Sequence, residues 1–198
     1  MARREGVYLF SALVTYTPGH AREENQLLIF DPRGALVVRY HKARPVPGDP
    51  EIGADRTLPV LDTPFGRTGA AICFDMDFPD LVRREGRAGV DFMLVPSSDW
   101  SDIDPIHTHM ALLRGIENGC SVVRQTAKGL SATADYEGRI LASTDYFRAE
   151  EPVMVAQVPR RGVRTIYARV GDLFAWICLA GVLLAALLAM RQRQVDDM

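Results

Sequence analysis

Apolar and polar residues alternate over short stretches of the chain, and this pattern predicts a series of strands. The runs are rich in β-branched and aromatic residues and are separated by Gly, Pro and Asp, as is typical of strands and turns. Asp31-Pro32-Arg33-Gly34 is a favourable turn sequence and predicts a β-hairpin between the second and third runs. The predicted strands are residues 7–17, 25–30, 35–40, 58–62, 68–74, 90–95, 121–125, 130–134, 140–143 and 153–158.

Two helices are predicted in the middle of the chain. Residues 79–87 follow a helical pattern that begins at a proline, a residue favoured in the first turn. Residues 106–118 repeat apolar positions at the helical period and stop before Gly119, a typical terminator. Strands alternate with helices here, whereas hairpins flank them. This order predicts a layered α/β fold with a mixed sheet.

A continuous apolar segment, residues 173–190, stands apart from the rest. Its sequence LFAWICLAGVLLAALLAM holds no charge and no proline, and its length meets the lower bound for a membrane-spanning helix. A helix buried in a soluble core would normally show a polar stripe, and this one shows none. We therefore predict one C-terminal transmembrane helix. The chain then divides into residues 1–168, a folded domain, and residues 169–198, the helix with its short tail.

Composition limits the classes of protein that remain. The chain has 198 residues, of which 47% are hydrophobic, enough for a packed core, so a mainly disordered chain is excluded. Lys and Arg number 23 against 25 Asp and Glu, so no basic excess points to nucleic acid. The three widely spaced cysteines form neither a disulfide framework nor a CxxC zinc pattern.

Cys73 is the first candidate for chemistry, because it lies between a buried strand and a helix in ICFDMDFP. Such a turn can present a nucleophile beside backbone N–H groups that would stabilise an oxyanion. Position alone also allows a packing role, which is common for free cysteine. Lys42, in YHKARPVPG, gains meaning only if it converges on Cys73, where its ammonium group would stabilise a thiolate and an oxyanion. From spacing alone, Glu51, in GDPEIG, is interpreted as a surface charge.

For the other polar side chains the sequence favours structural roles over catalytic or metal-binding ones. Asp75 and Asp77 would orient a neighbour or, as the pattern favours, cap the helix at Pro79. His107 and His109 lack a clear third ligand, so no metal site is predicted. Arg114 and Glu117 have the spacing of a helical ion pair.

Taken in order, these segments resemble the nitrilase, or carbon–nitrogen hydrolase, superfamily. The motifs are YHKARPVPG around Lys42, GAAICFDMDFPDLVRR around Cys73, VPSSDW over residues 95–100, and the run HMALLRGIENGCSVVRQTAKGLSATADYEGRI. The end, TIYARVGDLFAW followed by an apolar helix, is similar to the apolipoprotein N-acyltransferase branch. The resemblance implies a nitrilase-like αββα sandwich, partial in this chain, followed by one transmembrane helix.

The resemblance also assigns roles to the candidate residues. It implies that Cys73 attacks an acyl carbonyl to form a thioester, that Lys42 stabilises the oxyanion, and that Glu51 matches an auxiliary glutamate after the lysine. The glutamate that serves as general base lies upstream in the family, before the strand matched by residues 7–17. We therefore expect the chain to be a fragment of a longer protein, from a mis-called start, or an inactive remnant, and whether it is an enzyme by itself stays open.

Three functions follow from the resemblance. The first is an N-acyltransferase that moves an acyl chain from a phospholipid to the N-terminal amine of an apolipoprotein. The second is a carbon–nitrogen hydrolase, of the amidase or nitrilase type, acting on a small amide. The third is a catalytically inactive, membrane-tethered module. The first implies a cell-membrane location with the catalytic domain outside the cytoplasm, no metal or organic cofactor, and no nucleic acid partner, and leaves the oligomeric state open.

Overall fold

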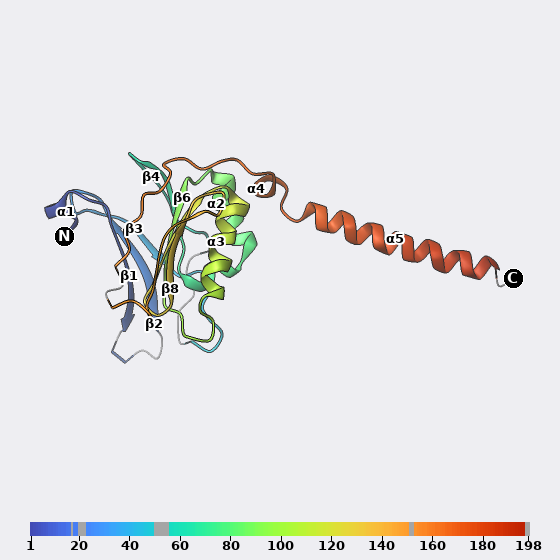
Figure 1. Cartoon of the computed structure of the whole chain (residues 1–198), viewed down its shortest axis with the longest axis horizontal. Coiled ribbons are helices and arrows are strands. Elements are labelled where there is room, and N and C mark those ends of the chain that lie inside the picture. The colour runs from blue at the N-terminus through green and yellow to red at the C-terminus, as the bar shows by residue number, and fades with distance from the viewer. Residues whose placement is uncertain (17, 20–22, 50–55, 151–152, 197–198) are drawn as a thin grey trace.

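The computed structural model of the chain describes all residues except 17, 20–22, 50–55, 151–152 and 197–198. A strand-rich domain is followed by a long helix that projects away from it (Figure 1). A short helix α1 (Ala2–Glu5) precedes a three-stranded antiparallel sheet of β1 (Leu9–Tyr16), β2 (Glu23–Phe30) and β3 (Leu36–His41). The predicted hairpin is confirmed: the Asp31 carboxylate accepts hydrogen bonds from the backbone N–H groups of Arg33 and Ala35, both at 2.9 Å.

A second, six-stranded sheet forms the centre of the domain, in the order β4-β5-β6-β7-β8-β9. Its strands β5, β6 and β7 pair in parallel and the outer pairs are antiparallel, so the predicted mixed sheet is confirmed. The strands are β4 (Val60–Thr63), β5 (Gly66–Ala70), β6 (Phe92–Ser97), β7 (Ser121–Thr126), β8 (Leu130–Ala134) and β9 (Ile140–Asp145).

Two helices connect the parallel strands and cover one face of this sheet. They are α2 (Pro79–Ala88) and α3 (Ile106–Asn118), and the three-stranded sheet lies on the opposite side (Figure 1). Both end where a glycine, Gly89 or Gly119, takes a left-handed backbone conformation that side chains disfavour. Two sheets and a helical layer make a partial αββα sandwich. Its core includes Leu27, Tyr40, Ala70, Ile72, Met76, Val82, Met93, Val95 and Val122.

Two strand predictions are corrected. The strand predicted over residues 68–74 ends at Ala70, and a 3₁₀ turn, η1 (Cys73–Asp77), follows it, because Cys73 takes a left-handed φ of 49° that no strand continues. The strand predicted over residues 153–158 does not form. Exposure alternates there as in a strand, with Val153 and Val155 facing solvent, but no neighbouring strand pairs with it among the described residues.

The C-terminal apolar segment forms one helix, α5 (Leu173–Asp196), after the short helix α4 (Ile166–Val170). Its stretch Leu173–Gln192 is long and apolar enough to cross a membrane, and none of it is buried against the domain. Length and composition therefore make it a candidate span.

Candidate active site

Cys73 lies at the start of η1, between β5 and α2, in a strained backbone conformation. It is the one residue other than glycine with a positive φ in the described chain. Such strain persists only where the surroundings enforce it, and it is concentrated at functional sites. The position of Cys73 on a tight turn thus agrees with the presentation of a nucleophile.

Asp75 holds this turn in place. Its carboxylate accepts hydrogen bonds from the Ile72 N–H at 2.9 Å, the Tyr40 hydroxyl at 2.7 Å and the Arg44 N–H at 2.8 Å. Burial raises the pKa of this carboxyl, and the three donors oppose that rise. Asp75 therefore caps the Cys73 turn and not α2, which corrects the capping prediction, and it ties the turn to the end of β3.

Lys42 reaches the same place, because it follows β3 directly. Its backbone N–H donates to the Asn25 carbonyl at 2.9 Å, and its side chain is buried. Cys73 and Lys42 line one open cavity of about 680 Å³, together with Asp49, Asp99 and Trp100. The structure thus brings Cys73 and Lys42 together, and their catalytic roles stay predictions. Glu51 lies outside the described residues.

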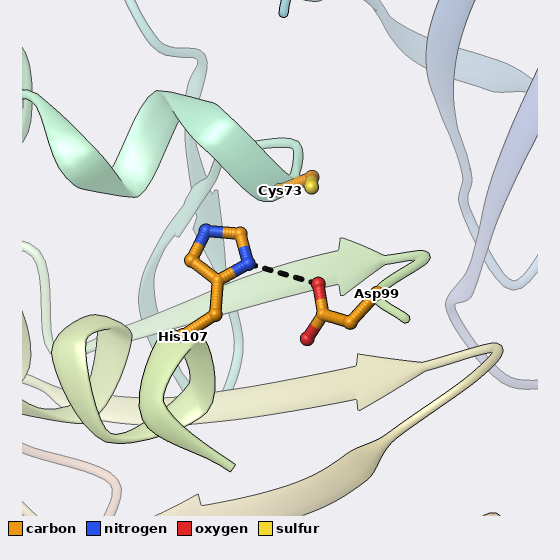
Figure 2. Close-up of side chains that lie close together, drawn as sticks. All are labelled: Cys73, Asp99 and His107. Carbon is orange, nitrogen blue, oxygen red and sulfur yellow. Dashed lines mark hydrogen bonds and ion pairs between the residues drawn. The ribbon is translucent and has the colours of Figure 1, made fainter. Parts of the chain in front are cut away.

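A largely buried ionic network lies beside Cys73, and the sequence analysis did not predict it. His107, in the first turn of α3, points toward Asp99 in the loop after β6 (Figure 2). Its Nδ1 lies 2.9 Å from Asp99 Oδ1, and its Nε2 lies 3.0 Å from Asp77 Oδ1. Arg124 of β7 donates from Nη2 to Asp99 Oδ2 at 3.0 Å, and the Ser97 hydroxyl donates to Asp99 Oδ1 at 2.7 Å.

The charges of this network follow from its geometry. Hydrogen bonds to Asp77 and Asp99 raise the pKa of His107 to about 9, against burial and the charge of Arg124. Burial raises the pKa of Asp99, but His107, Arg124 and Ser97 outweigh it and lower that pKa to about 2. At neutral pH an imidazolium therefore lies between two carboxylates, and both ring nitrogens donate.

The same side chains are of types that ligate metals. The Cys73 sulfur, an Asp99 oxygen and a His107 nitrogen all lie within 4.8 Å of one another. Both nitrogens of His107 already face carboxylates, and Arg124 pairs with Asp99. A metal would have to displace these partners, so the group is best described as an ion-pair network.

One sequence signal could have drawn attention to Arg124. Arg124 stands inside the apolar strand run SVVRQT and is fully buried, and a buried arginine requires anionic partners. Asp99 and His107 gave no comparable signal, since they come from other elements. The helical pair Arg114–Glu117, in contrast, was predicted from spacing and is confirmed at 2.8 Å.

Comparison with known proteins agrees with the fold. Residues 1–168 match the family described as carbon-nitrogen hydrolase. Among curated proteins, an apolipoprotein N-acyltransferase from Geobacter metallireducens is 34% identical over 152 residues, which are 75% of this chain and 28% of that protein. The deaminated glutathione amidase of Mus musculus is 31% identical over 140 residues, 62% of this chain and 43% of that protein.

Solved structures show the same fold. An amidase from Nesterenkonia sp. AN1 superposes with a TM-score of 0.70 at 19% identity. The superposition covers 85% of this chain and 66% of the amidase chain. The chain spans about a quarter of the length of the Geobacter relative, so it corresponds to only part of that protein.

Proposed function

Because the chain belongs to the carbon-nitrogen hydrolase family, we propose that the cavity around Cys73 transfers acyl groups through a cysteine thioester. The donor in this proposal is a phospholipid, and the acceptor is the N-terminal amine of an apolipoprotein. This proposal rests on one observation: the same chain holds a cavity with a candidate nucleophile and an apolar helix. A cavity with Cys73 and Lys42 is followed by an exposed apolar helix of membrane-spanning length.

The first half-reaction would charge the cysteine. The Cys73 sulfur attacks the ester carbonyl carbon of the donor, and an S–C bond forms while the carbonyl oxygen takes negative charge. The ammonium of Lys42 would stabilise that oxyanion from the cavity wall. When the C–O bond breaks, the alkoxide of the lysophospholipid leaves and takes up the proton that the Cys73 thiol gave up on attack.

The second half-reaction would transfer the acyl group from Cys73 to the acceptor. The acceptor amine attacks the thioester carbon, a C–N bond forms, and the S–C bond breaks to return the Cys73 thiolate. The amine must lose a proton, which requires a base. By resemblance, the general base of the family is a glutamate upstream of the strand matched by residues 7–17, and Glu51 is the proposed auxiliary glutamate that would assist it. Asp99 is poorly suited to act as the base, because the charges of Arg124 and His107 hold its pKa at about 2.

The exposed helix supports a lipid donor. An apolar stretch with nothing packed on it is stable only in lipid or against another protein. In a bilayer it would keep the Cys73 domain at the membrane surface, where phospholipid is concentrated. We therefore propose a location at the cell membrane. The resemblance to the N-acyltransferases supports a catalytic domain outside the cytoplasm.

A second candidate function is hydrolysis of a small amide. It is favoured by the similarity to the deaminated glutathione amidase of Mus musculus. The first half-reaction would be the same, with an amine as leaving group, and water would then attack the thioester. A third candidate, a catalytically inactive module, predicts that replacing Cys73 changes nothing.

A transfer assay separates the three. The full chain is placed in phospholipid vesicles with a labelled acyl chain, and a lipopeptide bearing a free N-terminal amine is added. We expect label in the lipopeptide, and none with C73A. Labelled free fatty acid alone, or release of ammonia from small amides, would favour the hydrolase, and equal results for C73A and the wild type would favour the inactive module.

A further inference from the structure

His107 joins three separate parts of the site, and neither half-reaction above assigns it a role. Its ring contacts Asp77, the last residue of η1, and Asp99, in the loop after β6. The ring itself belongs to α3 and is buried. Since Cys73 is the first residue of η1, the His107–Asp77 contact holds the far end of the short turn that carries the sulfur.

We propose that His107 is a positioning residue, which acts on Cys73 through Asp77 by fixing η1 against α3 and the loop after β6. This inference deepens the proposed function, on which it rests, because it assigns the group that holds the nucleophile in the cavity. Asp75 fixes η1 from the side of β3, and His107 fixes it from the opposite side. The left-handed backbone of Cys73 is thereby enforced from two directions.

The role requires a doubly protonated ring. A neutral imidazole donates only one hydrogen bond, whereas the bridge from Asp77 to Asp99 needs two. The charged groups that face the ring are Asp77 of η1, Asp99 of the loop after β6 and Arg124 of β7, and the Cys73 sulfur lies within 4.8 Å of the ring–Asp99 pair. Arg124 Nη2 lies 3.0 Å from Nδ1, and both donors share the Asp99 carboxylate.

Alkylation of Cys73 by iodoacetamide tests this without any acyl donor. The full chain is used with C178S, because Cys178 is exposed, whereas Cys120 is fully buried and burial raises its pKa to about 12. The modified Cys73 peptide is quantified by mass spectrometry. We expect H107Q to react about tenfold more slowly, since a displaced turn no longer aims the sulfur into the cavity. H109Q, in the exposed position two residues along α3, is the matched control and should react like the wild type.

D77N separates positioning from a simple charge effect. Removing a carboxylate near the sulfur would by charge alone favour the thiolate and speed alkylation. If His107 acts through Asp77, D77N slows alkylation instead, and the H107Q/D77N double variant is no slower than H107Q alone. D77N reacting at or above the wild-type rate would overturn the proposal, and this arm also decides the matter if H107Q does not fold.

The pH profile gives a signature that a purely structural defect would not produce. Because the pKa of His107 is raised to about 9, its second proton is present below that pH and lost above it. The ratio of wild-type to H107Q rates should be constant near neutrality and fall toward one above about pH 10. A ratio that does not change through this range would contradict the role. Failure of acyl transfer with these alkylation results intact would instead count against the proposed function.

Discussion

At the scale of single residues, the site depends on buried ionisable groups whose partners come from distant parts of the chain. Asp75 receives donors from the β3 region, and Asp99 receives Arg124 and His107 from β7 and α3. These contacts could not be read from the sequence, because spacing along one element shows only near neighbours. The sequence offered Cys73 as a candidate through its position between a strand and a helix, and Lys42 through the resemblance to the family. Their meeting in one cavity is a property of the fold.

Glu85 of α2 is a buried carboxyl with an unpaired oxygen, and it sets a pH dependence of stability. Burial raises its pKa from 4.5 to about 8. Above pH 4.5 the unfolded chain therefore releases a proton that the folded chain retains. The folded state loses relative stability as pH rises from 4.5 to about 8, and the loss is constant above that pH.

We expect E85Q to remove this loss. At about 1.4 kcal/mol per pKa unit, the variant should gain on the order of 4 kcal/mol relative to the wild type between pH 4.5 and pH 8.5. Urea unfolding of both proteins at pH 5 and pH 8.5 measures it. Equal differences in unfolding free energy at the two pH values would show that Glu85 ionises normally in the fold.

At the scale of elements, helices and hairpins were predicted best. The helix predicted over residues 106–118 matches α3 (Ile106–Asn118), because apolar period and a terminating glycine act locally. The strand predicted over residues 153–158 was wrong, because alternation indicates a half-buried surface and not a hydrogen-bonded neighbour. The end of β5 was misplaced for another reason: the turn after it depends on the Asp75 carboxylate and on distant donors.

Gly119 ends α3 in a conformation that a side chain would disturb. Its φ is +71°, and a Cβ added there would collide with the Val163 carbonyl oxygen. We expect G119A to destabilise the domain by about 1 kcal/mol or more, since both backbone strain and a clash oppose it. Thermal unfolding measures the loss. G181A, in α5 with open space around the glycine, is the matched control and should unfold like the wild type.

At the scale of the whole molecule, a compact domain is followed by an exposed apolar helix that is long and apolar enough to cross a membrane. The sequence already predicted this division from the uncharged run of residues 173–190, and the structure adds that Leu173–Gln192 is not buried in the domain. The partial sandwich was predicted through ordered motifs and not through periodicity, which indicated only a layered α/β fold. The proposed acyl transfer from phospholipid therefore requires both parts of the chain.

Removal of residues 173–198 tests that cooperation. Because Leu173–Gln192 is not buried against the domain, we expect the shortened chain to unfold at a similar temperature but to lose flotation with phospholipid vesicles. Its acyl transfer from vesicle lipid should be lost, whereas hydrolysis of a water-soluble ester or amide would not depend on the helix. Continued flotation of the shortened chain would show that the domain itself binds lipid.

Mass spectrometry of the Cys73 peptide tests most directly whether Cys73 carries an acyl group taken from phospholipid. The full chain is incubated in vesicles of phospholipid with defined acyl chains, and the Cys73 peptide is examined by mass spectrometry with and without hydroxylamine, which cleaves thioesters. We expect an adduct with the mass of the donor's acyl chain, sensitive to hydroxylamine and absent from C73A. An unmodified Cys73 peptide in vesicles to which the protein is bound, or the same adduct on Cys178 in C73A, would contradict it.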